Sequence, residues 1–103
     1  MSNTWPLAEM IGYTPITTFW NDFTIAEPFG ENAVRDTFNR AFEEWKGNYK
    51  YLTELVMVLN HKIWQHADHS LADIYNELWE NAYDYGMCNL KDDGLQYFLT
   101  ILD

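Results

Sequence analysis

The sequence predicts an all-α fold, a compact bundle of four to five helices in a single domain of residues 1–103. Three observations predict it. Apolar residues recur at helical spacing in successive segments, helix-start residues and glycine or proline stops bound those segments, and the connections between them are short. With 103 residues, 48% of them hydrophobic and 17% aromatic, the chain can bury one modest core.

The first predicted helix follows an N-terminal segment, residues 1–13, that has no clear periodicity. Its apolar residues allow two alternatives, an arm packed on the body of the protein or a loosely packed arm. Thr14 can cap the helix, and Pro15 favours the first helical position. Pro28 and Gly30 end it. Its apolar stripe has the spacing i, i+3, i+4, i+7: Ile16, Phe19, Trp20 and Phe23.

The second and third helices, residues 31–46 and 49–67, are predicted to form an antiparallel hairpin. The link between them, Gly47 and Asn48, is very short, and glycine is a favourable helix stop. Each helix has an apolar stripe: Val34, Phe38, Ala41, Phe42 and Trp45 in the second, and Leu52, Leu55, Val56, Leu59 and Ile63 in the third. The third helix is also apolar outside its stripe, which predicts a central position in the bundle.

The fourth predicted helix begins with a pair that resembles a capping box, Ser70 and Asp73, and ends at Gly86. With the second and third helices it completes the antiparallel frame. A short fifth helix follows, because four apolar residues of the C-terminal segment share one side: Leu95, Phe98, Leu99 and Leu102.

The fourth helix is predicted to have one acidic face, which we call the acidic ridge: Asp73, Glu77, Glu80 and Asp84. Their spacing places the carboxylates within an arc of about 60° and along roughly 16 Å of helix. The opposite, core-facing side is apolar: Leu71, Ile74, Tyr75, Leu78, Ala82 and Tyr85. Like charges at this spacing destabilise a helix by about 0.2–0.5 kcal/mol per pair, and no Lys or Arg occurs from Ile63 to Leu90.

The ridge predicts a surface that binds a basic protein partner, whose cations would relieve the repulsion. Tyr83 lies beside Glu80 and Asp84, and tyrosine is frequent in interfaces. A sharper hypothesis is that the ridge mimics the charge of nucleic acid and so occupies a DNA-binding protein. The alternative is that the ridge is only the solvated face of a surface helix.

The overall charge excludes some classes of partner. The formal net charge is −10, which argues against direct nucleic-acid binding and against docking on anionic lipid. The charge is concentrated in the C-terminal part, because residues 63–103 hold 8 acidic residues and 1 basic residue, a net charge of −7. No long apolar run or signal-peptide pattern is present, and a single cysteine fits a reducing compartment, so a cytoplasmic protein is predicted.

A second hypothesis is a helical homodimer that serves as a structural or adaptor protein. Exposed aromatic residues would form its contact together with the residues on the outer side of the third helix, Met57, Val58 and Trp64. Sedimentation would distinguish this dimer from a monomer.

A third hypothesis is weak binding of a divalent metal by His66 and His69. These residues are three apart near a helix end, with Asp68 and Asp73 nearby, but the spacing departs from the H-x-x-x-H pattern of helical zinc sites. The alternative for His66 is an imidazole at the edge of the core, bonded to a carbonyl group.

No pattern of catalytic residues points to an enzyme or to a cofactor. The chain lacks the nucleophile-elbow, phosphate-loop and zincin motifs. Cys88 has no flanking group except Lys91 to lower its thiol pKa, so we expect it to be a small buried apolar residue. The sequence therefore predicts a non-enzymatic protein without a cofactor.

The stretches "TTFWNDFTIAEPFG", "YLTELVMVLNHKIWQH" and "LADIYNELWENA" resemble a family of small acidic proteins of unknown function from gut bacteria, which are often tied to mobile elements. The likeness spans residues 17–103. It implies no established activity, fold or site. What it implies about function is an accessory protein that acts on another macromolecule.

Overall fold

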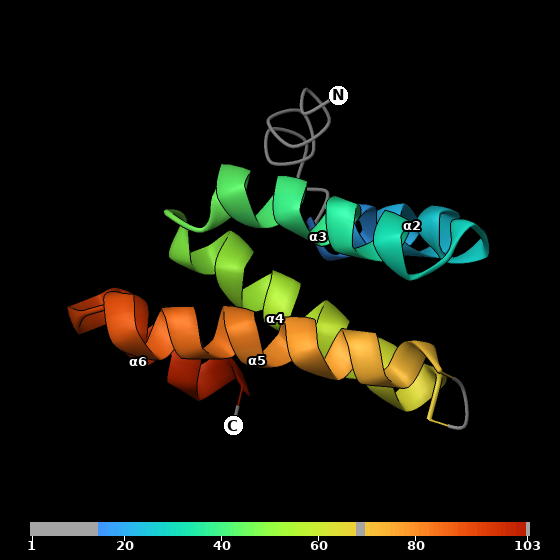
Figure 1. Ribbon diagram of the computed structural model, residues 1–103. Helices are drawn as coiled ribbons and strands as arrows, with labels where there is room; N and C mark the ends of the chain where they lie inside the picture. Colours follow the sequence, from blue (N-terminus) through green and yellow to red (C-terminus); the bar gives the residue numbers. More distant parts are fainter. Residues whose placement is uncertain (1–14, 68–69, 103) are drawn as a thin grey trace.

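The computed structural model describes residues 15–67 and 70–102, which form an all-α bundle (Figure 1). The elements follow in this order: α2 (Pro15–Ala26), the 3-10 helix η1 (Glu27–Phe29), α3 (Glu31–Trp45), α4 (Tyr49–Gln65), α5 (Leu71–Asn89) and α6 (Asp92–Leu102). The predicted fold class is confirmed. The predicted arm of residues 1–13 and the predicted cap Thr14 lie outside the described residues. Within the described part, no helix is both long and apolar enough to cross a membrane.

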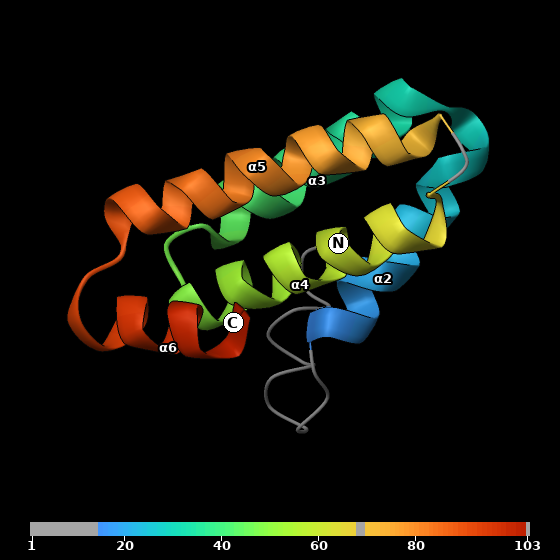
Figure 2. The same ribbon diagram turned by 90° about the horizontal axis from the view of Figure 1, so that it is seen from below.

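Successive helices run in opposite directions, and α4 lies at the centre of the bundle (Figures 1 and 2). α4 contacts α2, α3, α5 and α6. Its buried side chains surround much of the helix: Tyr51, Leu52, Thr53, Leu55, Val56, Val58, Leu59 and Lys62. The predicted central position is therefore confirmed. The predicted placement of Val58 on an outer surface is wrong, because a helix packed against four others has few free sides.

Caps and turns set the helix boundaries. The Asn48 side chain accepts hydrogen bonds from the backbone N–H groups of Lys50 and Tyr51, which begins α4. Gly30 separates η1 from α3 with φ of +98°, a conformation that glycine adopts without strain. The predicted capping box at Ser70 is wrong, because the Ser70 side chain makes no capping hydrogen bond and its backbone angles (φ −59°, ψ −24°) are helical and not those of a typical N-cap.

Gly86 does not end α5, as the sequence predicted, but lies inside it. The helix continues to Asn89, and Gly86 is buried against the ring of Phe98 from α6. A Cβ atom at position 86 would lie 2.7 Å from Phe98 Cε1, closer than a carbon–carbon contact permits. The glycine therefore allows α5 and α6 to approach each other, and its role is packing rather than termination.

Candidate functional site

α5 places the acidic ridge on the surface of the bundle. Asp73, Glu77, Glu80 and Asp84 are all exposed. The opposite side of the helix carries its buried residues: Leu71, Ile74, Tyr75, Leu78, Ala82 and Gly86. The predicted division of this helix into an acidic and a core-facing side is confirmed, except that Tyr85 is only half-buried.

One carboxylate of the ridge has a cation from another helix. Arg35 on α3 donates two hydrogen bonds to Glu77, from Nη1 to Oε2 over 2.6 Å and from Nη2 to Oε1 over 3.2 Å. The hydrogen bond from Arg35 holds the pKa of Glu77 below its usual value, and Glu77 raises the pKa of Arg35 in turn. The absence of basic residues within α5 is thus compensated at one position by α3.

The other ridge carboxylates make no ion pair with any residue in the described ranges 15–67 and 70–102: Asp73, Glu80 and Asp84. Because α5 extends to Asn89, Asp84 is more than one turn from the C-terminus of the helix, where the macrodipole would disfavour it. Cys88 is exposed, so the prediction that it is buried is wrong. Four residues after Asp84 in the lengthened helix, Cys88 lies on the same side as the ridge.

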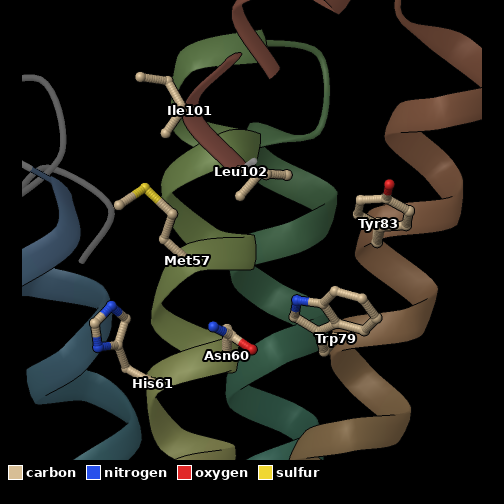
Figure 3. Close-up of a pocket in the computed structure, with 7 residues that line it drawn as sticks. All are labelled: Met57, Asn60, His61, Trp79, Tyr83, Ile101 and Leu102. Carbon is tan, nitrogen blue, oxygen red and sulfur yellow. The ribbon is translucent and has the colours of Figure 1, made fainter. Parts of the chain in front are cut away.

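A groove of about 380 Å³ lies between α4, α5 and α6 (Figure 3). Its lining residues come from three helices: Met57, Asn60 and His61 from α4, Trp79 and Tyr83 from α5, and Ile101 and Leu102 from α6. In Figure 3, Met57, Asn60 and His61 line one side, Trp79 and Tyr83 face them from α5, and Leu102 lies between Met57 and Tyr83. The volume is at the lower end of the range for ligand sites, roughly 300–1,000 Å³.

Tyr83 connects the groove with the acidic ridge. Its ring stacks on Trp79, with ring centroids 5.0 Å apart and planes 11° apart, and also lies 5.7 Å from the Phe98 ring. In the sequence it is flanked by Glu80 at i−3 and by Asp84 at i+1. Glu80 and Asp84 are thus close to Tyr83 along α5 but do not line the groove, and neither has an ion-pair partner in the part of the chain that the structure describes.

A second polar arrangement, which we call the Glu27 cluster (Glu27, Lys62, His66 and Tyr75), joins three helical segments inside the bundle. Glu27 Oε2 lies 2.6 Å from the Tyr75 hydroxyl, 2.9 Å from Lys62 Nζ and 3.0 Å from His66 Nε2. Lys62 is fully buried and also donates to Thr24 Oγ1 over 2.8 Å. A buried charge without partners is very costly. The contacts of Lys62 with Glu27 and Thr24 offset this cost for its ammonium group.

The contacts of the Glu27 cluster shift the pKa values of the Glu27 carboxyl and the Tyr75 hydroxyl. Burial raises the pKa of the Glu27 carboxyl, but the hydrogen bonds from Tyr75 and Lys62 and the Lys62 charge outweigh burial, so the pKa is lowered overall. Burial, followed by the hydrogen bond to Glu27, raises the pKa of Tyr75. The cluster thus favours an ionised Glu27 and a protonated Tyr75.

The sequence contains a signal for the Glu27 cluster that the prediction missed. Glu27 follows Trp20 by seven residues and Phe23 by four, which places it on the apolar stripe of the first predicted helix. Lys62 follows Leu55 by seven residues and lies on the stripe of α4 in the same way. A charged residue in an apolar stripe indicates a buried, paired group.

Only one of the two histidines proposed for metal binding lies among the described residues. His66 Nε2 lies 3.0 Å from the carboxylate of Glu27, and His69 lies outside the described residues. Among the described residues, no group of three or more His, Cys, Asp or Glu side chains is placed to hold a metal ion. His61 is exposed and lines the groove.

The three residues of α4 proposed for a homodimer contact differ from one another in their exposure. Trp64 is 74% exposed, Met57 is half-buried in the wall of the groove, and Val58 is 2% exposed. Val58 therefore cannot contribute to a contact between two subunits, whereas Trp64 stays available for one.

Comparisons with protein families, with curated proteins and with solved structures find no match to this chain. The resemblance to small acidic proteins of gut bacteria stays a prediction. The candidate site is therefore defined by the geometry of α5 and of the groove beside it.

Proposed function

We propose that this chain is a non-enzymatic interaction protein whose acidic α5 surface binds a basic macromolecular partner. The observation that carries the proposal is the state of three ridge carboxylates, Asp73, Glu80 and Asp84. They are exposed on one face of one helix, and no cation of the described residues pairs with them. A partner's Lys or Arg side chains would satisfy these charges and remove their mutual repulsion.

The distribution of the cations supports the proposal. All six Lys and Arg residues of the chain lie in the described part, and three of them already form ion pairs with acidic residues: Arg35, Lys46 and Lys62. Lys62 is buried and adds no positive charge to the surface. The only basic residue after position 62 is Lys91, so the α5 surface has a strong excess of negative charge.

Mimicry of nucleic-acid charge is a narrower form of the same proposal. The charge density of the ridge, compared with that of duplex DNA, favours the broader form, in which the partner is any basic protein segment. The ridge spans roughly 16 Å. Duplex DNA has one phosphate charge per ~1.7 Å of axis, or about ten over that length. The ridge has four carboxylates, of which Arg35 neutralises one, Glu77. A basic protein segment with a few cations matches this surface better than a groove that binds duplex DNA.

The proposal is tested by capturing partners from a lysate of the source organism at low and at high salt. The bait is the wild-type chain, and the comparison bait carries Asp73→Asn, Glu77→Gln, Glu80→Gln and Asp84→Asn. A basic partner captured by the wild type at low salt only, and not by the variant, supports the proposal, because exposed charges are screened as ionic strength rises. A partner retained equally by both baits contradicts it.

A further inference from the structure

The groove beside the acidic ridge has the composition of a site for apolar side chains. Trp79 and Tyr83 present two parallel rings at its border, and Met57 and Ile101 add flexible and aliphatic surface. Ile101 is 42% exposed, so it is only partly covered by its own chain. Tryptophan and tyrosine in such positions contribute much of the binding energy of protein interfaces.

The charges around the groove restrict what can bind in it. Glu80 and Asp84 lie at i−3 and i+1 from Tyr83 on α5, outside the lining of the groove itself, and have no cation among the described residues. A ligand that carries negative charge beside its apolar group would be repelled, and an uncharged apolar ligand would leave both carboxylates without a partner. The occupant with complementary chemistry has apolar side chains next to Lys or Arg.

We propose that the groove binds a basic amphipathic helix of a protein partner, with one apolar side chain inserted into the groove beside the rings of Trp79 and Tyr83 and with Lys or Arg side chains on Glu80 and Asp84. This proposal rests on the proposed function and names the partner's chemistry. The mode of recognition is a helix in a groove, in which apolar residues at i, i+3, i+4 and i+7 supply the anchors.

The test uses three synthetic helical peptides of about 20 residues, long enough to form helix in water. The Leu–Lys peptide has leucines at i, i+3, i+4 and i+7 on one face, lysines beside that face and alanines elsewhere, because lysines at every other position would repel one another and unfold the helix. The Ala–Lys peptide has the same charge with alanine in place of leucine, and the Leu–Glu peptide has the opposite charge. The affinity of the full chain for each peptide is measured by fluorescence anisotropy. We expect the Leu–Lys peptide to bind at least about tenfold more tightly than the Ala–Lys peptide, and the Leu–Glu peptide not to bind.

Variants then assign the binding to the groove. In the groove variant, Met57→Gln and Ile101→Gln replace apolar surface by polar groups of good helix propensity. We expect it to lose about tenfold in affinity for the Leu–Lys peptide and nothing for the Ala–Lys peptide. The control variant carries Ile25→Gln and Phe29→Gln, which remove apolar residues that are 67% and 78% exposed but lie outside the groove. We expect it to bind both peptides as the wild type does.

The outcomes separate the groove from the ridge. If the groove variant and the wild type prefer the Leu–Lys peptide to the same degree, the groove does not bind the apolar anchor and this proposal is overturned. If both Lys peptides bind and the substitutions Glu80→Gln and Asp84→Asn weaken neither, the proposed function fails instead. Should the two substitutions of the groove variant unfold the chain, as circular dichroism would reveal, Ile101→Gln alone provides the same comparison at an exposed position.

Discussion

Lys62 Nζ lies 2.9 Å from Glu27 Oε2 inside the bundle, and the Lys62 side chain has no exposed surface. The ammonium group also lies 3.9 Å from the centroid of the Trp20 ring. Because the same carboxylate oxygen accepts from Tyr75 over 2.6 Å, one atom connects η1 with α4 and α5. Lys62 and Glu27 therefore form the buried ion pair of a cluster that links three helical segments.

Removing the cation of this pair should destabilise the protein strongly. Lys62→Met retains the length of the side chain but leaves Glu27 partly buried without its charge partner, and we expect the free energy of unfolding to fall by about 3 kcal/mol. Urea denaturation measures the change. Lys50→Met, at an exposed lysine of the same helix, should change it by less than about 0.5 kcal/mol.

A double-mutant cycle separates the ion pair from the packing of the lysine side chain. The variant with Glu27→Gln and Lys62→Met should lose less stability than the sum of the two single variants, because the second substitution removes a charge that the first one left unpaired. Additive effects would mean that the two charges do not interact in the folded protein.

The Glu27 carboxylate should also make stability depend on pH. Its pKa is lower in the folded protein than in the unfolded chain, so its contribution is complete above the unfolded value of about 4.3 and is lost as the pH falls through the folded value. The difference in unfolding free energy between the wild type and Glu27→Gln should therefore be largest near neutral pH and shrink below about pH 4.3. A difference that stays constant down to acid pH would contradict this assignment.

Gly86→Ala should destabilise the protein although alanine has the higher helix propensity. Propensity alone favours alanine by about 1 kcal/mol, but the new Cβ atom would overlap the Phe98 ring, and overpacking costs typically 1–3 kcal/mol. We expect a lower thermal midpoint in calorimetry. Gly47→Ala is the matched control, because no atom lies within 4 Å of a Cβ atom at that position, and it should cause no loss. An unchanged or raised midpoint for Gly86→Ala would show that α6 can move away without cost.

The pair of Arg35 and Glu77 should limit the charge of the α5 surface without adding much stability. An exposed ion pair contributes about 0–1 kcal/mol. Arg35→Gln frees the Glu77 carboxylate, so the variant protein should bind the Leu–Lys peptide more tightly than the wild type at low salt. Lys50→Gln makes the same change in net charge on α4 and should have a smaller effect. Equal effects would mean that binding follows net charge and not this surface.

Much of the fold could be predicted from sequence because it depends on short-range patterns. In the part of the chain that the structure describes, the helices α2 to α6, the central position of α4 and the two sides of α5 follow from periodicity within one segment each. The pairing of Arg35 with Glu77, the Glu27 cluster and the groove depend on how different helices are placed side by side. No single-helix pattern contains that information. For Lys62 and Glu27 the sequence does indicate burial, since both lie on apolar stripes, but it does not identify the partner.

The errors of the sequence-based prediction have local causes. Gly86 was interpreted as a helix stop because glycine often ends helices, whereas here it permits close contact with Phe98. The lack of basic neighbours favours a buried Cys88, but its exposure depends on α5, which continues to Asn89 and carries Cys88 on its exposed side. Val58 lies outside the main apolar stripe of its helix, which predicts an outer position, but α4 contacts four other helices and buries this side as well.

The most direct test of the central claim is whether the position of the carboxylates matters, beyond their number. Affinity for the Leu–Lys peptide at about 50 mM salt, where exposed charges are weakly screened, is measured for the wild type and for two variants. The α5 variant carries Asp73→Asn, Glu80→Gln and Asp84→Asn. The α3 variant neutralises the same number of exposed acidic residues: Glu31→Gln, Asp36→Asn and Glu44→Gln.

A surface on α5 that binds a basic partner predicts a loss of at least about tenfold for the α5 variant and a much smaller loss for the α3 variant. Equal losses in the two variants would contradict the account, because binding would then follow only from the net charge of the protein.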